Sequence, residues 1–150
     1  MKKMIAFLFL SAFLAGLNNF VIEDISKFDK FSKALIVSEE DVELQCEKVQ
    51  NGQDFYYIFE NEKDIVQMTE KFEDVKGINL YFDKNISLTY FSNQINYFSK
   101  GQDVEDMEVY YGYYPGYKDF RFVDGKKINV QLVKTADCWI MGFPLILTGF

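Results

Sequence analysis

Histidine is absent from this chain of 150 residues, and arginine occurs once, at Arg121. The missing imidazole excludes Ser-His-Asp and Cys-His nucleophile systems, Cys/His zinc sites and histidine acid–base chemistry. The formal charge is −7. Nucleic-acid-binding proteins normally carry a basic face with arginines that contact phosphates and base edges. We therefore expect no binding of nucleic acid and no histidine-dependent catalysis.

The motifs of common nucleotide-binding and hydrolytic enzymes are also missing. The sequence contains no Walker A motif, no Gly-x-Gly-x-x-Gly after a strand, no Gly-x-Ser-x-Gly and no His-Glu-x-x-His. The acidic segment DVEDMEV places Glu108 where a calcium-binding EF-hand loop, counted from Asp103, requires glycine. We expect no catalytic residues, no metal site, no cofactor and no enzymatic activity.

The first residues have the pattern of an export signal. Lys2 and Lys3 precede an apolar run from Met4 to Leu17, which matches the charged and apolar parts of a secretory signal. The run is shorter than the roughly 20 residues that a membrane-spanning helix needs. We predict a signal sequence over residues 1–17 and a single domain over residues 23–150. The alternative is an uncleaved anchor that extends to Ile22. Either way the protein is exported, and it contacts a membrane only through this segment.

Apolar residues recur at helical spacing in three segments of the remaining chain. The first predicts a helix over about residues 24–34. The second predicts a helix within residues 61–77, with Gly77 placed to end it. The third predicts a helix between Ser87 and Gly101, although its aromatic content is also typical of a strand.

Alternating patterns mark the expected strands. Apolar and polar residues alternate from Val42 to Cys46, Asn51-Gly52 has the composition of a hairpin turn, and Phe55–Phe59 forms the predicted return strand. Ile78–Phe82 predicts a further strand. The remainder predicts a four-stranded antiparallel meander. Its expected turns are Pro115-Gly116, Asp124-Gly125 and Lys134–Asp137.

A two-residue turn at Pro115-Gly116 would pair Tyr111 with Phe120. Burial then favours a three-residue or bulged loop at Asp124-Gly125, because a two-residue loop would bury Lys127. This register predicts that Tyr111, Phe120, Phe122, Leu132 and Trp139 form an inner, core-facing surface. The fold class is therefore α+β: an antiparallel sheet with a C-terminal four-stranded meander and two or three helices packed on one face.

The same register leaves four residues on the outer face of the meander. These candidate binding residues are Tyr110, Tyr114, Tyr117 and Arg121. Exposed tyrosines can stack on a sugar or pack against a partner protein. The alternative is that these rings are ordinary strand residues, half covered by their neighbours.

The two cysteines could form a disulfide after export. The predicted registers place Cys46 on the apolar face of its strand and Cys138 on the face opposite Trp139. Two thiols that face different ways cannot be bridged without moving the backbone. Two free thiols are therefore favoured, and the pairing of Cys46 with Cys138 stays open.

The C-terminal third resembles the end of the YwmB-like family. The resemblance rests on YYGYYPGY from Tyr110, GKKINVQLV from Gly125 and WIMGFPLILTGF from Trp139. Members of that family are exported bacterial proteins with a TATA-box-binding-protein-like α+β fold and no established biochemical role. The resemblance thus implies export and that fold, and it implies no catalytic residues. A shared fold does not imply DNA binding.

These observations favour an exported, non-enzymatic interaction protein that acts in the periplasm, on the cell surface or outside the cell. Its partner would be a protein or a glycan of the envelope. The alternative is a glycan- or cell-wall-binding module that uses the outward tyrosines of the hairpin over residues 109–122. A hydrolase that uses only carboxylates is a third possibility, and it would need two acidic side chains in one cleft.

Overall fold

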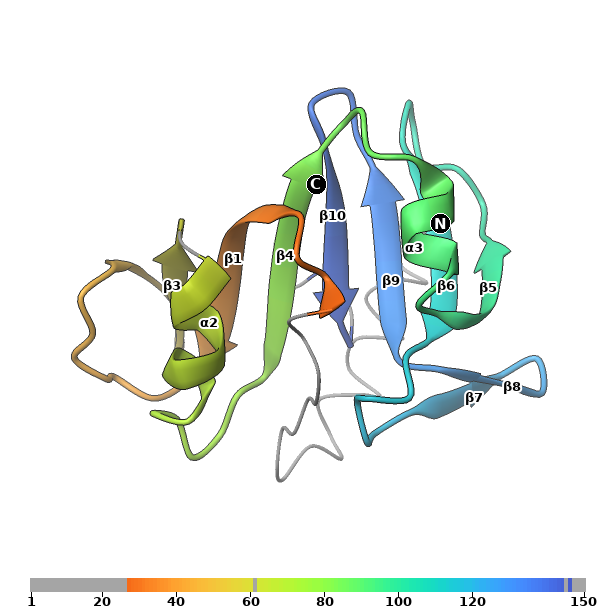
Figure 1. Cartoon of the computed structure of the whole chain (residues 1–150). Coiled ribbons are helices and arrows are strands. Elements are labelled where there is room, and N and C mark those ends of the chain that lie inside the picture. Colours follow the sequence, from red (N-terminus) through yellow and green to blue (C-terminus); the bar gives the residue numbers. More distant parts are fainter. Residues whose placement is uncertain (1–26, 61, 145, 147–150) are drawn as a thin grey trace.

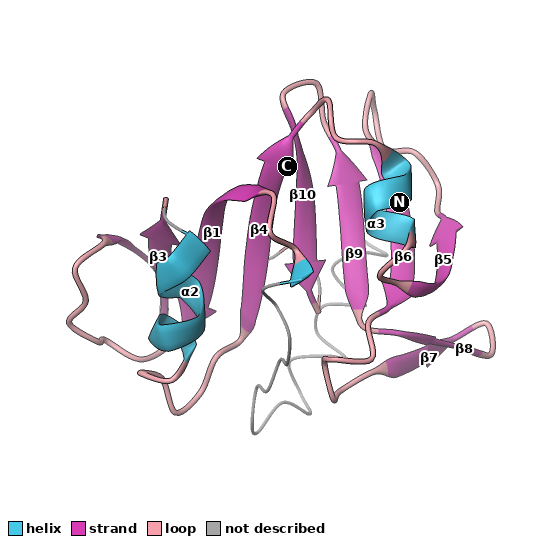
Figure 2. Ribbon diagram, viewed as in Figure 1, coloured by secondary structure: helices cyan, strands magenta, loops and turns pink. Residues whose placement is uncertain are grey.

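The computed structural model describes residues 27–60, 62–144 and 146. The predicted signal sequence or anchor and the first residues of the first predicted helix lie outside the described residues. Within them the fold is α+β and rich in antiparallel sheet, as predicted (Figures 1 and 2).

One eight-stranded sheet forms the body of the molecule, in the order β2-β3-β1-β4-β10-β9-β6-β5. Its strands are β1 (Phe31–Ser38), β2 (Glu47–Asn51), β3 (Asp54–Phe59), β4 (Gly77–Asp83), β5 (Asn96–Lys100), β6 (Glu108–Tyr113), β9 (Val130–Lys134) and β10 (Cys138–Phe143). The helices are α2 (Glu62–Thr69) and α3 (Leu88–Ser92). A separate two-stranded ribbon consists of β7 (Arg121–Val123) and β8 (Lys126–Ile128).

The prediction of a helix over residues 24–34 is wrong for residues 28–34, because residues 28–30 form a loop and turn and β1 begins at Phe31. The continuous apolar run from Ala34 to Val37 explains the difference. This strand pairs with β3 on one edge and β4 on the other, and all four of these residues are buried, so both of its faces are covered. Such a run suits a central strand better than an amphipathic helix, which would expose one side.

The first predicted hairpin is confirmed. Asn51 pairs with Asp54 across a two-residue turn in which Gly52 has a positive φ of 65°. Its first strand begins at Glu47 and not at Val42. The backbone N–H of Val42 instead donates to the hydroxyl of Tyr57 at 2.8 Å, so this segment lies outside the ladder.

The second predicted helix exists but ends at Thr69, and Gly77 is the first residue of β4. The carboxylate of Glu40 accepts hydrogen bonds from the backbone N–H groups of Glu73 at 3.2 Å and Asp74 at 2.7 Å. These donors are therefore turned toward the loop after β1 and are not available to a continuing helix. The prediction that Gly77 ends the helix is wrong for this reason.

The third predicted helix is correct only in its first part, because α3 ends at Ser92 and β5 begins at Asn96. The β-forming residues after Ile95 pair with β6. The ring of Phe98 stacks on Tyr110 with centroids 5.1 Å apart and planes 7° apart. This cross-strand contact favours a strand over further helical turns.

A C-terminal four-stranded meander is present, but its strands are β5, β6, β9 and β10. The register predicted across Pro115-Gly116 is wrong. Tyr111 lies opposite Gln131 on β9 and not opposite Phe120. The ribbon of β7 and β8 leaves the sheet between β6 and β9, and Figure 1 shows it beside the lower end of β6 and β5.

The faces predicted for the last two strands are correct, although the pairing is shifted by two residues from the one that a tight Thr135-Ala136 turn would give. Leu132 pairs with Met141, which places Leu132 and Trp139 on one face of the sheet. The same face carries the main core cluster, which includes Ile65 of α2 and Phe91 of α3. Cys138 belongs to a smaller cluster on the other face, with Val133 and Ile140. The prediction that Cys46 and Cys138 face different ways is confirmed, because Cys46 packs against the main cluster and both thiols are free.

Trp139 is predicted to be one of the most costly side chains to remove. It is 2% exposed, its ring lies 5.1 Å from that of Phe91, and its Nε1–H donates to the carbonyl of Ile86 at 3.0 Å. Trp139→Ala should lower the free energy of unfolding by about 3–5 kcal/mol in urea titrations. Phe122→Ala is the matched control. Because Phe122 is 67% exposed, its loss should change stability by less than about 0.5 kcal/mol. A reversed ranking of the two variants would contradict the described core.

Candidate functional site

The three tyrosines predicted to face outward are buried. Tyr110, Tyr114 and Tyr117 are 7%, 3% and 0% exposed, and all three belong to the main core cluster. The predicted outer placement is therefore wrong. Its cause is the strand pairing: with β9 as the partner of β6, Tyr110 lies opposite Leu132 and faces the same side as Trp139. Tyr111, predicted to be core, lies half-buried on the other face.

These tyrosines have structural contacts that account for their burial. The hydroxyl of Tyr110 donates to the Glu108 carboxylate at 2.6 Å, and the Tyr114 ring packs edge-on against Phe28 and Phe143. Burial, with a smaller contribution from Glu108, raises the pKa of Tyr110 to about 12. Burial also raises the pKa values of Tyr111 and Tyr117. These rings are thus part of the core and do not form a binding platform.

Arg121 is the one predicted site residue on a surface element. It begins β7, lies opposite Ile128 in the ribbon and is half-buried. It is therefore on a different element from Tyr110, beside which the prediction had placed it. The ribbon that carries Arg121 also carries the most exposed large apolar side chain of the described residues, Phe122.

The ribbon is closed by a two-residue turn. Val123 pairs with Lys126, and the turn residues Asp124 and Gly125 have positive φ values of 52° and 77°. Two positive φ angles are typical of the type I′ hairpin turn that Asp-Gly favours. The prediction of a longer or bulged loop here is wrong. The longer loop was predicted because a two-residue loop would have buried Lys127 in the sheet. Lys127 avoids this burial because the ribbon lies outside the eight-stranded sheet.

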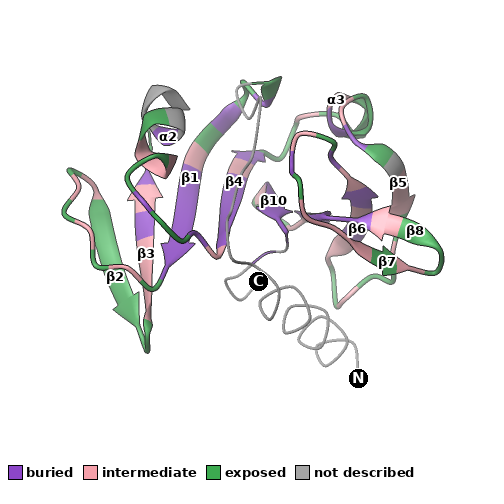
Figure 3. Cartoon of the chain, turned by 90° about the horizontal axis from the view of Figure 1, so that it is seen from below, coloured by how far each residue is buried: buried purple, intermediate pink, exposed green. Residues whose placement is uncertain are grey.

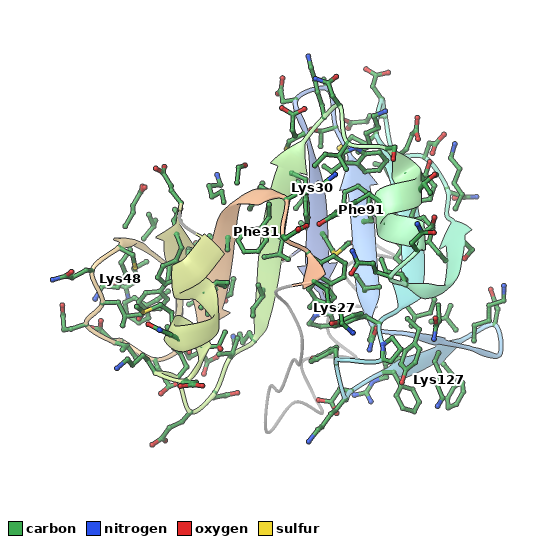
Figure 4. All side chains as sticks on the ribbon, viewed as in Figure 1. Lys27, Lys30, Phe31, Lys48, Phe91 and Lys127 are labelled. Carbon is green, nitrogen blue, oxygen red and sulfur yellow. The ribbon has the colours of Figure 1, made fainter. Side chains whose placement is uncertain are left out.

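One side of the ribbon carries an aromatic–lysine cluster, formed by Tyr113, Phe120, Phe122 and Lys127. The Phe120 ring lies edge-on to both Tyr113, at 6.0 Å, and Phe122, at 5.4 Å. The Nζ of Lys127 lies over Phe120 at 4.5 Å from the ring centroid and over Tyr113 at 5.6 Å. Figure 4 shows Lys127 among ring side chains at the end of the molecule. The ring quadrupole attracts the ammonium group in such cation–π contacts.

The ribbon is also one of the basic stretches of an acidic chain. Residues 118–127 contain four basic and two acidic side chains, a net charge of +2, whereas the rest of the chain carries −9. Some other lysines form ion pairs: Lys48 lies 2.6 Å from Asp41, and Lys76 lies 2.6 Å from Asp54. Between Lys126 or Lys127 and the described carboxylates, no ion pair forms within 4.0 Å.

A cavity of about 320 Å³ lies on the other side of the ribbon. Its lining residues are Ser99, Lys100, Gly101, Tyr111, Val123, Asp124, Lys126 and Ile128. The ring of Tyr111 lies against Gly101, where a β-carbon would come within 2.7 Å of it, so glycine is needed at this position. The cavity has one carboxylate among its described lining residues, that of Asp124, where hydrolysis by a carboxylate pair would need two.

A second cavity, of about 470 Å³, lies beside the turn at Pro115-Gly116. Its other lining residues are Lys27, Asn93, Gln94, Asn96 and Tyr114. Carboxamide side chains donate and accept hydrogen bonds, which suits the hydroxyl groups of a sugar. Tyr114 contributes to this wall although it is only 3% exposed.

No family model matches this chain, and neither a curated protein nor a solved structure is found that resembles it significantly. Within the described residues, no three His, Cys, Asp or Glu side chains are grouped as they would be to hold a metal ion. Of the helices in the described ranges, none has the length and apolar character needed to cross a membrane.

Phe120 and Phe122 were predicted to lie in the core, and Lys127 was not among the predicted binding residues. The signal that could have found the site is FRFVDGKK, from Phe120 to Lys127. A two-residue turn is the usual conformation of Asp-Gly between short strands. A two-residue turn at Asp124-Gly125 pairs Phe122 with Lys127. A pair that contains lysine does not suit a buried sheet but does suit a ribbon at the surface.

The raised tyrosine pKa values predict a loss of stability at alkaline pH. An ordinary tyrosine ionises near pH 10, so the unfolded chain releases these protons before the folded chain does. The contribution of Tyr110 is complete below about pH 10 and is lost as the pH rises through about 12. Urea unfolding at rising pH should show this decline, with phenolate absorbance appearing together with unfolding.

Tyr110→Phe is the control for that experiment, because it removes the hydroxyl and keeps the ring. Its stability should decline less between pH 10 and pH 12 than that of the unchanged protein. Ionisation of all tyrosines near pH 10 with no change in stability would show that the buried placement of Tyr110 and Tyr117 is wrong.

Proposed function

We propose that this protein is an exported, non-enzymatic binding protein of the cell envelope, and that the β7–β8 ribbon is its binding surface. The single observation that carries the proposal is Phe122, a large apolar side chain left 67% exposed within the aromatic–lysine cluster. Exposed apolar groups rimmed by polar residues are typical of interaction sites, and aromatic residues are enriched there.

Phe122 can change without disturbing the core, which suits a binding residue. Phe122 belongs to neither hydrophobic core cluster of the described residues. The base of the ribbon is nevertheless held firmly, because Asn129, which follows β8 directly, is fully buried and hydrogen-bonded. Figure 3 shows exposed residues on the ribbon and on β2, at opposite ends of the molecule.

Export is part of the proposal and is supported by the basic and apolar pattern of residues 1–17. A reporter fused after residue 25 should be active outside the cytoplasm, and activity only in the cytoplasm would contradict export. Membership of the YwmB-like family is likewise proposed, on the C-terminal motifs. We also propose that α2 and α3 pack on one face, since Ile65 and Phe91 share one core cluster.

A second candidate is binding of an envelope glycan at the cavity beside Pro115-Gly116. The observation in its favour is the set of three carboxamides, Asn93, Gln94 and Asn96, in one concave wall. This glycan site differs from the one predicted from the sequence, which used outward tyrosines, because Tyr110 and Tyr117 lie in the core. Contact with a ligand here would be made through amides and not by stacking on exposed rings.

Photo-crosslinking from position 122 tests the ribbon. A diazirine amino acid replaces Phe122 in the test variant. In two parallel variants it replaces Val49, which is 44% exposed on the edge strand β2, or Asn96, which lies beside the second cavity. After irradiation of intact cells, mass spectrometry of the purified protein should show an adduct at position 122 and none at position 49. Equal adducts at 122 and 49 would contradict the proposal, and an adduct only at position 96 would favour the glycan cavity.

A further inference from the structure

We propose that the β7–β8 ribbon docks on an anionic lipid surface, with Phe122 among the headgroups and the surrounding lysines against lipid phosphates. This proposal rests on the proposed function, because it names the partner of the same surface. It differs from the sequence-based expectation, in which the membrane is contacted only through the N-terminal segment.

Charge favours docking of the ribbon on an anionic surface. Residues 118–127 carry +2 in a chain whose other residues together carry −9, so an anionic surface attracts this region although the summed charge of the remaining residues is repelled. Lys118 and Lys126 are exposed, and neither is paired with a described carboxylate within 4.0 Å. Such cations can approach phosphates without first breaking an ion pair. Basic residues near an anionic membrane each add to the attraction.

Apolar and cationic groups lie together on one side of the ribbon. Phe122 and Lys127 are paired residues, so they project from the same side of the ribbon. The Lys127 ammonium lies over the Phe120 ring at 4.5 Å. An aromatic body with a cation beside it suits the boundary between acyl chains and headgroups, where rings enter the apolar layer and ammonium groups stay with the phosphates.

The small size of the ribbon also favours a membrane over a protein partner. The ribbon comprises residues 121–128, whereas a stable protein–protein interface uses about 20–30 residues on each side. Docking on a membrane needs no matching partner surface, because lipids adapt to a small protruding element. An acidic protein segment and a second copy of this acidic chain are the competing occupants, and they are outcomes of the test below.

The test uses the full chain, reconstituted into vesicles, and a tryptophan that reports contact with lipid. Phe122→Trp is compared with Val49→Trp in vesicles of brominated phosphatidylglycerol and of brominated phosphatidylcholine. Bromine quenches tryptophan fluorescence only on contact. Trp139 is 2% exposed, so its fluorescence is the same background signal in both variants. Using the full chain keeps any contribution of the N-terminal segment equal in both variants.

We expect the Trp at position 122 to be quenched in phosphatidylglycerol, weakly quenched in phosphatidylcholine, and released from quenching at about 1 M salt, where screening is strong. Lys118→Gln with Lys126→Gln should lower the docked fraction, by roughly fivefold in the docking equilibrium for each lysine. Lys71→Gln with Lys84→Gln changes the net charge equally at exposed sites away from the ribbon and should have no effect.

Equal quenching at positions 122 and 49, or in both lipids, would overturn the lipid proposal. So would quenching that is unchanged by Lys118→Gln with Lys126→Gln. If position 122 is not quenched but crosslinks to a protein in cells, the lipid proposal fails while the proposed function stands. If crosslinking at 122 also fails, both fail. Concentration-dependent dimerisation lost in Phe122→Ser would instead assign the ribbon to contact between copies of this chain.

Discussion

The architecture depends on one buried amide, the side chain of Asn129. Its Oδ1 accepts the backbone N–H of Tyr114 at 2.7 Å, and its Nδ2 donates to the carbonyls of Tyr114 and Tyr117, both at 2.9 Å. Its own backbone N–H donates to the carbonyl of Gly112 at 3.0 Å. Each of these groups would cost about 1–3 kcal/mol if it were buried without a partner. Asn129 therefore fixes the end of β6 against the start of β9.

That constraint explains both the core and the surface. Because β9 is placed beside β6, the alternate residues of β6 that include Tyr110 face Trp139 and are buried. The intervening segment cannot enter the sheet between them, so it folds back as the β7–β8 ribbon and leaves Phe122 in contact with solvent. The same pairing thus gives the protein a tyrosine-rich core and a basic aromatic surface beside it.

Features set by residues close in the sequence were predicted correctly, whereas a strand pairing between distant segments was missed. The first hairpin and the shared face of Leu132 and Trp139 follow from short-range composition and parity, and both are confirmed, although the hairpin turn is Gly52-Gln53 and not Asn51-Gly52. The partner of β6 lies across a ribbon-forming insertion, and residue parity in β6 cannot by itself identify that partner. The predicted face of Tyr110 was wrong for this reason. The candidate site was then missed because Phe122, on the ribbon, has the same apolar character as a core residue.

The pairing of β6 with β9 can be measured directly by cross-strand nuclear Overhauser effects in the isotopically labelled protein. The structure predicts backbone contacts between Tyr111 and Gln131 and between Val109 and Val133, with separate contacts between Phe122 and Lys127. Contacts between Tyr111 and Phe120 would instead show that β6 pairs with the segment after Pro115. That result would return Tyr110 to the outer face, place Phe122 in the core and contradict the account of the ribbon.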